Sequence, residues 1–184
     1  MNKKISLRLA TGADAKQLLA IYAPYVTDTT VTFEYEVPTV EEFAKRISNT
    51  LQKFPYYVAV VDGEIAGYSY ASSFRARAAY DWAVETTIYI RQDFRGYGIG
   101  SMLYSALEET LKTQGILTML ACVAYPNPPS VAFHEKVGFH RVGLFSKSGY
   151  KLGQWIDIVW MEKHIGAHHE NPLPVVPFSK MDEA

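Results

Sequence analysis

Short runs of alternating apolar and polar residues predict strands along most of the chain. Between these runs, apolar residues recur every three or four positions after Thr11, after Thr39 and after residue 98, which predicts helices. Thr39 and Glu42 form a capping box for the second helix, and Asp62-Gly63 is typical of a hairpin turn. The predicted strands are 5–9, 56–61, 65–72, 82–90, 117–123, 139–145 and 155–161. Hairpins come first and a strand–helix–strand–helix passage follows, so we expect an α/β (α+β) fold with a mixed sheet and helices on its faces.

Glycine and proline signals bound the later elements. Gly115 ends the helix that begins near residue 99, Asn127-Pro128 starts a short helix, and Gly138 ends it. A turn is predicted between the last two strands, around Gly149 and Gly153. Residues 1–165 therefore predict one domain. Residues 166–184 contain Pro172, Pro174 and Pro177 and lack periodicity, so we expect an extended arm that is either loose or lies on a neighbouring surface.

Composition excludes several classes of protein. The 184 residues suit one domain, and a formal net charge of −1 argues against a protein that binds the nucleic-acid backbone. No apolar run approaches the ~20 residues of a membrane-spanning helix, and Lys3, Lys4 and Arg8 come too early for a signal peptide. A single cysteine, Cys122, excludes a disulfide framework. We therefore expect a cytoplasmic protein with no membrane or nucleic-acid partner.

Alternating glycines between a predicted strand and helix indicate an anion-binding turn. Gly96, Gly98 and Gly100 let backbone N–H groups approach an anion, the helix N-terminus adds donors, and Arg95 adds a charge. A P-loop would place a lysine after its glycines, whereas Ser101 follows Gly100 directly. The glycine spacing also differs from the G-x-G-x-x-G dinucleotide motif. A strand-to-helix turn without a ligand remains the alternative.

The turn and its surroundings resemble the Gcn5-related N-acetyltransferase (GNAT) superfamily. Residues 95–100 match its R/Q-x-x-G-x-G/A pyrophosphate loop, and residues 127–139 look like its N-x-x-S…E-K-x-G-F segment. Residues 79–89 are more narrowly similar to phosphinothricin and methionine sulfoximine acetyltransferases. The resemblance covers about residues 5–163. It implies a mostly antiparallel sheet with helices on both faces, acetyl-CoA as co-substrate without a metal, and a homodimer.

The same resemblance implies an acetyl-CoA site made from the end of the fourth strand, the glycine turn and the short helix. Ile88 and Ile90 would bind through their backbones, although both also suit core packing. Asn127 is explained equally well as a helix cap, and Lys136 would reach an anionic part of CoA or only solvent. The predicted contacts are Ile88, Tyr89, Ile90, Arg95, Gly96, Tyr97, Gly98, Ile99, Gly100, Ser101, Asn127, Ser130 and Lys136.

Two residues are candidates for proton transfer. Glu85 lies in an apolar strand and shares a face with Thr87 and Tyr89, so partial desolvation would raise its proton affinity and suit a general base. The alternative is an edge-strand glutamate that faces solvent. The resemblance places His134 where many relatives carry a tyrosine that protonates the leaving thiolate, although a helix-surface residue is equally compatible.

The acceptor pocket is assigned to two arginines and two aromatic residues. Arg75 and Arg77 can grip a carboxylate or phosphinate, or can simply form a solvated loop, and the resemblance favours binding. Phe33 and Tyr35 would form walls of the pocket. The segment that contains Tyr80 and Trp82 is expected to line it as well.

The remaining reactive side chains give weaker indications of function. Cys122 lies in an apolar strand and reads as a small buried residue, since no base adjoins it. His164, His168 and His169 lack the ligands to complete a metal site, so no metal is predicted.

We expect an enzyme that transfers acetyl to the α-amine of a small amino acid or an analogue such as phosphinothricin, methionine sulfoximine or methionine sulfone. Transfer would be direct, in a ternary complex, with Glu85 as base. The alternatives are a superfamily member that acetylates a protein N-terminus or an antibiotic amine, and an acetyl-CoA-binding module without turnover.

Overall fold

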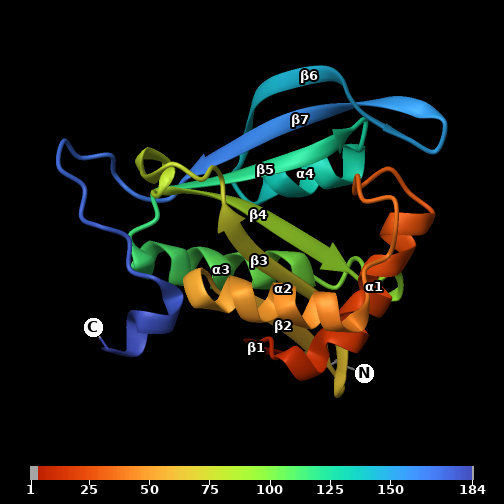
Figure 1. Ribbon diagram of the computed structural model, residues 1–184, viewed down its shortest axis with the longest axis horizontal. Coiled ribbons are helices and arrows are strands. Elements are labelled where there is room, and N and C mark those ends of the chain that lie inside the picture. The colour runs from red at the N-terminus through yellow and green to blue at the C-terminus, as the bar shows by residue number, and fades with distance from the viewer. Residues whose placement is uncertain (1–3, 184) are drawn as a thin grey trace.

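The computed structural model describes residues 4–183, in which one central sheet carries helices on both faces (Figure 1). The strands are β1 (Ile5–Leu9), β2 (Tyr56–Val61), β3 (Glu64–Ser73), β4 (Ala83–Ile90), β5 (Thr118–Tyr125), β6 (His140–Lys151) and β7 (Gln154–His164). The α-helices are α1 (Ala15–Thr27), α2 (Val40–Lys53), α3 (Ile99–Gln114) and α4 (Pro128–Lys136). Every predicted strand and helix is present; most bounds change little, but the strand predicted at 139–145 extends to Lys151.

The strands follow the order β1-β2-β3-β4-β5-β7-β6. Among these described strands β4 and β5 pair in parallel and the other neighbours pair antiparallel. One core packs α1 and α2 on β2 and β3, and a second packs α3 and α4 on β4, β5 and β7. The prediction of a mixed, mostly antiparallel sheet between two helical layers is therefore confirmed.

The parallel pair opens the sheet at its centre. Only Ala83–Glu85 of β4 pair with Thr118–Leu120 of β5. Beyond this point β4 continues to Ile90 and β5 to Tyr125, and the two strands diverge (Figure 1). The sheet therefore has a wedge-shaped opening between two of its central strands.

Alternation along β3 and β4 assigns side chains to the two faces of the sheet. Tyr68 and Tyr89 pack with α1 and α2, whereas Val84 packs with α3. Glu85 and Thr87 share the parity of Tyr89 and therefore lie on its face of the sheet. The central position of β4 excludes the edge-strand alternative for Glu85.

Two turns show how local sequence sets the strand ends. Asp62 and Gly63 have φ of 51° and 92°, the left-handed pair that a two-residue hairpin requires. The last hairpin turns at Leu152 and Gly153, with φ of 51° and 77°. Gly149, predicted near that turn, instead lies within β6 beside an irregularity in its pairing with β7.

The C-terminal arm lies on the body of the protein. Gln114, at the buried end of α3, donates hydrogen bonds of 2.8 Å to the carbonyls of Lys53 and Val176. Trp82 Nε1 donates to the carbonyl of Leu173. Of the two predicted alternatives, loose or packed, the packed one is confirmed, and Trp82 holds the arm instead of lining an acceptor pocket.

Large apolar side chains are exposed on the β6–β7 hairpin, among them Leu144, Phe145 and Trp155. No helix within residues 4–183 is long and apolar enough to cross a membrane. The homodimer stays a prediction, which the exposed hairpin surface supports.

Replacing Thr39 with alanine should lower the free energy of unfolding by about 1 kcal/mol. Thr39 Oγ1 accepts from the amide of Glu42, and the Glu42 carboxylate accepts from the amide of Thr39, so the variant loses half of a reciprocal cap. Urea denaturation measures the loss. Thr39→Ser keeps the hydroxyl and should match the wild type; equal stability of the alanine variant would contradict the role of the cap.

Candidate functional site

The opening of the sheet leads into a cavity of about 620 Å³. The end of β4, the glycine turn and the first turns of α3 and α4 enclose it. The cavity brings together twelve of the residues predicted to contact acetyl-CoA: Ile88, Tyr89, Ile90, Arg95, Gly96, Gly98, Ile99, Gly100, Ser101, Asn127, Ser130 and Lys136. Tyr97 does not line this cavity; its ring is exposed and lies beside that of Phe94.

The backbone of β4 presents hydrogen-bonding groups to this cavity. The amide of Arg91 donates to the carbonyl of Ala66 on β3, so by strand alternation the backbone groups of Ile88 and Ile90 point away from β3. They face the side from which β5 has diverged. Tyr25 Oη donates to the Ile90 carbonyl at 2.7 Å. The Ile88 backbone is therefore positioned to pair with an extended ligand, and its side chain also packs against the core.

The glycine turn is shaped for close approach. Gly96 and Gly98 have φ of 83° and 79°, which glycine adopts without strain, and Gly98 caps the N-terminus of α3. A Cβ at Gly100 would lie 2.9 Å from Cε2 of Phe133, so glycine lets α3 and α4 pack closely. Arg95 Nη2 donates to Tyr25 Oη at 2.8 Å, which fixes the guanidinium beside the turn. Backbone donors, the helix N-terminus and this charge together suit a pyrophosphate.

Helix α4, from its capping residue to its last residue, supplies the other wall of the cavity. Asn127 Oδ1 accepts from the amide of Ser130 at 3.3 Å, so Asn127 caps α4. Asn127, Ser130 and Lys136 all line the cavity. Asn127 therefore both caps α4 and lies where the predicted contact with acetyl-CoA would be made.

Glu85 lies in an adjoining pocket of about 260 Å³. This pocket shares Val31, Ile88, Tyr89, Asn127 and Ser130 with the larger cavity. Burial raises the pKa of the Glu85 carboxyl above its usual range, and the positive charge of Arg75 partly offsets that effect. A half-buried carboxylate thus lies next to the cleft, with an increased affinity for protons.

His134 is buried and lies in the same pocket, which excludes the helix-surface alternative. Its Nδ1 lies 2.8 Å from the Ser130 carbonyl, which can only accept, so Nδ1 carries the proton and Nε2 accepts. Nε2 lies 3.1 Å from the hydroxyl of Tyr104, which reaches Thr86 on its other side. Burial lowers the pKa of His134, so the ring is uncharged at neutral pH and presents no proton at Nε2.

Cys122 also lines the Glu85 pocket and is only half-buried. Burial, together with the negative charge of Glu85, raises the pKa of its thiol to about 11. The thiol is therefore protonated at neutral pH and a poor nucleophile.

The residues predicted for the acceptor separate in space. Phe33 lines the Glu85 pocket. Arg75 is exposed, with its guanidinium carbon 4.3 Å from the centre of the Phe74 ring, and it is close enough to affect Glu85. Arg77 is exposed as well, and neither arginine lines the 620 Å³ cavity or the pocket that contains Glu85. Tyr35 is 70% exposed and donates to the carbonyl of Tyr150 at 2.5 Å.

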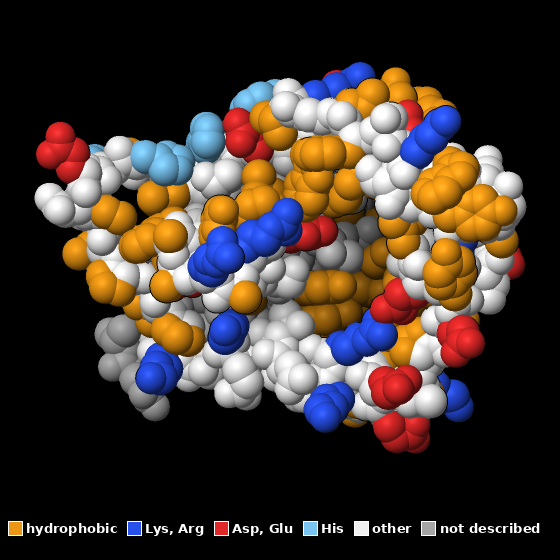
Figure 2. Space-filling view, turned by 45° about the horizontal axis from the view of Figure 1, so that its top comes forward, with side chains coloured by type: hydrophobic (Ala, Val, Ile, Leu, Met, Phe, Trp, Pro, Cys, Tyr) orange, Lys and Arg blue, Asp and Glu red, His pale blue; other side chains and the backbone are white. Residues whose placement is uncertain are grey.

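The β6–β7 hairpin closes over the loop between α1 and α2, which contains Phe33 and Tyr35. Besides the Tyr35 contact, Lys151 Nζ donates to the Thr32 carbonyl at 2.7 Å. The Phe33 ring rests on Gly149, where any Cβ would clash with it. Figure 2 shows this face of the molecule hollowed, with hydrophobic side chains inside the hollow and charged side chains at its rim.

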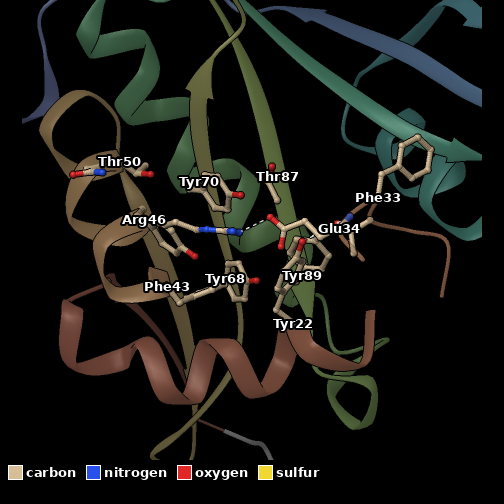
Figure 3. A pocket seen from close by; sticks show the side chains of 13 residues that line it. Tyr22, Phe33, Glu34, Phe43, Arg46, Thr50, Tyr68, Tyr70, Thr87 and Tyr89 are labelled. Carbon is tan, nitrogen blue, oxygen red and sulfur yellow. Dashed lines mark hydrogen bonds and ion pairs between the residues drawn. The ribbon is translucent and has the colours of Figure 1, made fainter. Parts of the chain in front are cut away.

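Sequence reasoning missed a further pocket of about 580 Å³ between α1, α2 and the β3–β4 face (Figure 3). Five tyrosines line it: Tyr22, Tyr56, Tyr68, Tyr70 and Tyr89. Arg46 of α2 reaches across to Glu34 and forms an ion pair of 2.7 Å. A weak signal for Arg46 was its place between the buried Phe43 and Ile47 of the same helix. Nothing in the local sequence pointed to Glu34.

Histidines gather where the arm leaves β7. His164 Nδ1 and His168 Nε2 each lie 3.2 Å from the hydroxyl of Thr118. Within residues 4–183, no group of three or more histidine, cysteine or carboxylate side chains is arranged to hold a metal ion. These contacts tie the arm to β5.

Comparison with known proteins places these features in a family. The model of the acetyltransferase (GNAT) domain matches residues 7–160. The chain is 34% identical over 175 residues to a phosphinothricin N-acetyltransferase of Streptomyces viridochromogenes, an alignment that covers 95% of this chain and 93% of the relative. It is 32% identical over 169 residues to an L-methionine sulfoximine/L-methionine sulfone acetyltransferase of Pseudomonas aeruginosa, covering 91% and 98%.

A solved structure agrees. The GNAT superfamily phosphinothricin acetyltransferase of Sinorhizobium meliloti, in complex with AcCoA, is 34% identical and superposes with a TM-score of 0.87. The match covers 95% of this chain and 98% of that one. With its opened sheet, glycine turn and matching family model, the chain belongs to the GNAT family of acetyltransferases.

Proposed function

We propose that the protein transfers acetyl from acetyl-CoA to the α-amine of a small amino acid or a phosphinic, sulfoximine or sulfone analogue. The observation that carries this proposal is the position of Glu85, a half-buried carboxylate in a pocket continuous with the cleft. The named activities of the relatives support the acceptor class.

The cleft accounts for acetyl-CoA binding. The glycine turn, the N-terminus of α3 and Arg95 hold the pyrophosphate, and the backbone of Ile88 pairs with the extended arm. The acetyl group then lies near Glu85, because Ile88 and Tyr89 belong to both the cleft and the Glu85 pocket.

Glu85 acts as the general base in direct transfer. The carboxylate takes a proton from the acceptor ammonium, and the free amine attacks the thioester carbonyl carbon. The carbon–sulfur bond breaks, the amide forms, and the thiolate takes up a proton as it leaves. His134 and Tyr104 supply that proton only through a change in their hydrogen bonds, because His134 Nε2 is an acceptor. The raised pKa of Cys122 speaks against an acyl-enzyme.

The closed hairpin favours a small acceptor over a protein N-terminus. Contacts of Phe33 with Gly149, of Tyr35 with Tyr150 and of Thr32 with Lys151 close the acceptor side. A peptide would need an open groove there. Arg75, near Glu85, is available for the carboxylate of an amino acid at the mouth of the pocket.

Incubation with acetyl-CoA and single amines should release CoA thiol with at least one α-amino acid or analogue. Phosphinothricin, methionine sulfoximine, methionine sulfone and ordinary amino acids form the panel, assayed by a thiol reagent. The matched N-acetylated compounds lack a nucleophile and should release none. Binding of acetyl-CoA without release from any amine would instead favour a module without turnover.

Glu85→Gln should lower kcat/KM by about 10²–10⁴-fold near neutral pH, the usual size of a general-base contribution. The wild-type rate should fall as pH drops through the raised pKa of Glu85, because only the carboxylate accepts a proton. The difference between the two proteins should narrow as pH rises toward the pKa of the acceptor amine. Glu109→Gln, an exposed carboxylate on α3, is the control. Identical pH profiles would remove Glu85 as the base.

Gly149→Ala should lower kcat/KM for the acceptor, by up to about 100-fold, since a displacement of ~1 Å at a site can reduce the rate by that factor. The added methyl group would push the Phe33 ring out of place. KM for acetyl-CoA should change little. Gly143→Ala is the matched control, because its nearest neighbour would be a Phe145 carbon at 3.8 Å. Equal kcat/KM values for the acceptor in both variants would show that Phe33 does not shape the acceptor pocket.

A further inference from the structure

The tyrosine-walled pocket continues the site that contains Glu85. The two pockets share Thr32, Phe33, Thr87 and Tyr89. Thr87 and Tyr89 follow Glu85 at alternate positions of β4, and Tyr70 pairs with Thr87 across the sheet. At ~3.4 Å per residue, Thr87 lies about 7 Å and Tyr89 about 14 Å from Glu85 along the strand. An amine at Glu85 can therefore extend its side chain into the tyrosine-walled pocket.

Two charged side chains line the tyrosine-walled pocket, and they oppose one another. Arg46 and Glu34 form their ion pair with side chains that are 48% and 36% exposed (Figure 3). Oε2 of Glu34 is buried, with no hydrogen-bond partner among the described residues. Outside the lining, the buried Lys151 donates to the carbonyl of Thr32, and its positive charge also interacts with the carboxylate of Glu34.

The remaining polar groups of this lining are neutral. Thr32, Asn49, Thr50 and Thr87 offer hydroxyl and amide groups. Burial raises the pKa of the tyrosine hydroxyls, that of Tyr22 to about 12, so the phenols are protonated. Apart from Arg46 and Glu34, the side chains of the lining therefore present neutral hydrogen-bond donors and acceptors.

This balance discriminates between ligands by charge. An anionic head group that binds Arg46 must displace Glu34 or lie beside it, and either leaves negative charges close together. A cationic head group that binds Glu34 would leave two positive charges, its own and that of Arg46, close together. A neutral group with one donor and one acceptor can bind Glu34 and Arg46 at once without separating them.

We propose that this pocket binds the side-chain head of the acceptor, and that the Arg46–Glu34 pair selects a neutral head carrying both a donor and an acceptor, such as a sulfoximine or carboxamide. The inference rests on the proposed function and specifies its acceptor. Arg46 and Glu34 are specificity residues in it, and Glu85 keeps its role.

Methionine sulfoximine and phosphinothricin provide the test, because their heads have similar shapes and differ in charge. The sulfoximine is neutral, with an oxygen acceptor and an N–H donor, whereas the phosphinate is an anion. The ratio of kcat/KM for the two compounds, measured on one preparation, does not depend on the fraction of folded enzyme. Calorimetric binding of each compound to the CoA complex is measured in parallel.

The wild type should favour the sulfoximine by about tenfold or more, the factor for one charge-assisted hydrogen bond. Glu34→Gln frees Arg46 for an anion and should shift the ratio toward phosphinothricin by about tenfold or more. Arg46→Met should weaken binding of the sulfoximine without improving that of phosphinothricin. Glu36→Gln, an exposed carboxylate two residues along the same loop, should leave the ratio unchanged.

The outcomes separate this inference from the proposed function. If both compounds are acetylated and Glu34→Gln leaves their ratio unchanged, the specificity pair is wrong and the acetyltransferase stands. If neither of these compounds nor any other amine of the panel releases thiol, but the calorimetric preference shifts in Glu34→Gln, the pocket is supported and the proposed reaction fails. A wild-type preference for phosphinothricin, or no binding of either compound, overturns the inference.

Discussion

The divergence of β4 from β5 after three paired residues is the constraint on which the site depends. The backbone N–H and C=O groups of a central strand normally form hydrogen bonds with both neighbouring strands, because burying such groups without partners costs free energy. Here the groups of Ile88 face an opening and remain available to a ligand. The same opening places the cleft next to Glu85, so the groups proposed for acetyl-CoA binding and for proton transfer lie on one strand.

Strand alternation then places successive side chains of β4 on opposite faces of the sheet. Glu85 lies on the face covered by α1 and α2, where the pockets proposed for the acceptor lie, while the side chain of Ile88 packs into the opposite core. A chain with a net charge of −1 can still bind an anionic co-substrate, because glycine backbone groups, a helix N-terminus and Arg95 supply local attraction. The anion site therefore needs no basic surface.

The tyrosines of the acceptor side combine apolar rings with neutral hydroxyls. Tyr56 and Tyr70 stack with ring centres 4.7 Å apart, and Tyr22 Oη lies 2.7 Å from Thr32 Oγ1. These walls add no charge, so under the proposed function Glu85, Arg75 and the Arg46–Glu34 pair determine how a charged acceptor is received. The β6–β7 hairpin contacts the loop between α1 and α2 on the same side of the molecule.

Short-range signals in the sequence determined the elements, the glycine turn and the motif of acetyl-CoA binding, because capping, left-handed turns and strand alternation act within a few residues. Only the tertiary structure showed that His134 is buried against Tyr104 and that Arg46 meets Glu34. It alone brought Lys151 to Thr32, 119 positions away. Such contacts depend on how hairpins and helices pack across the sheet, and the pattern of any one segment carries no record of the partner it meets.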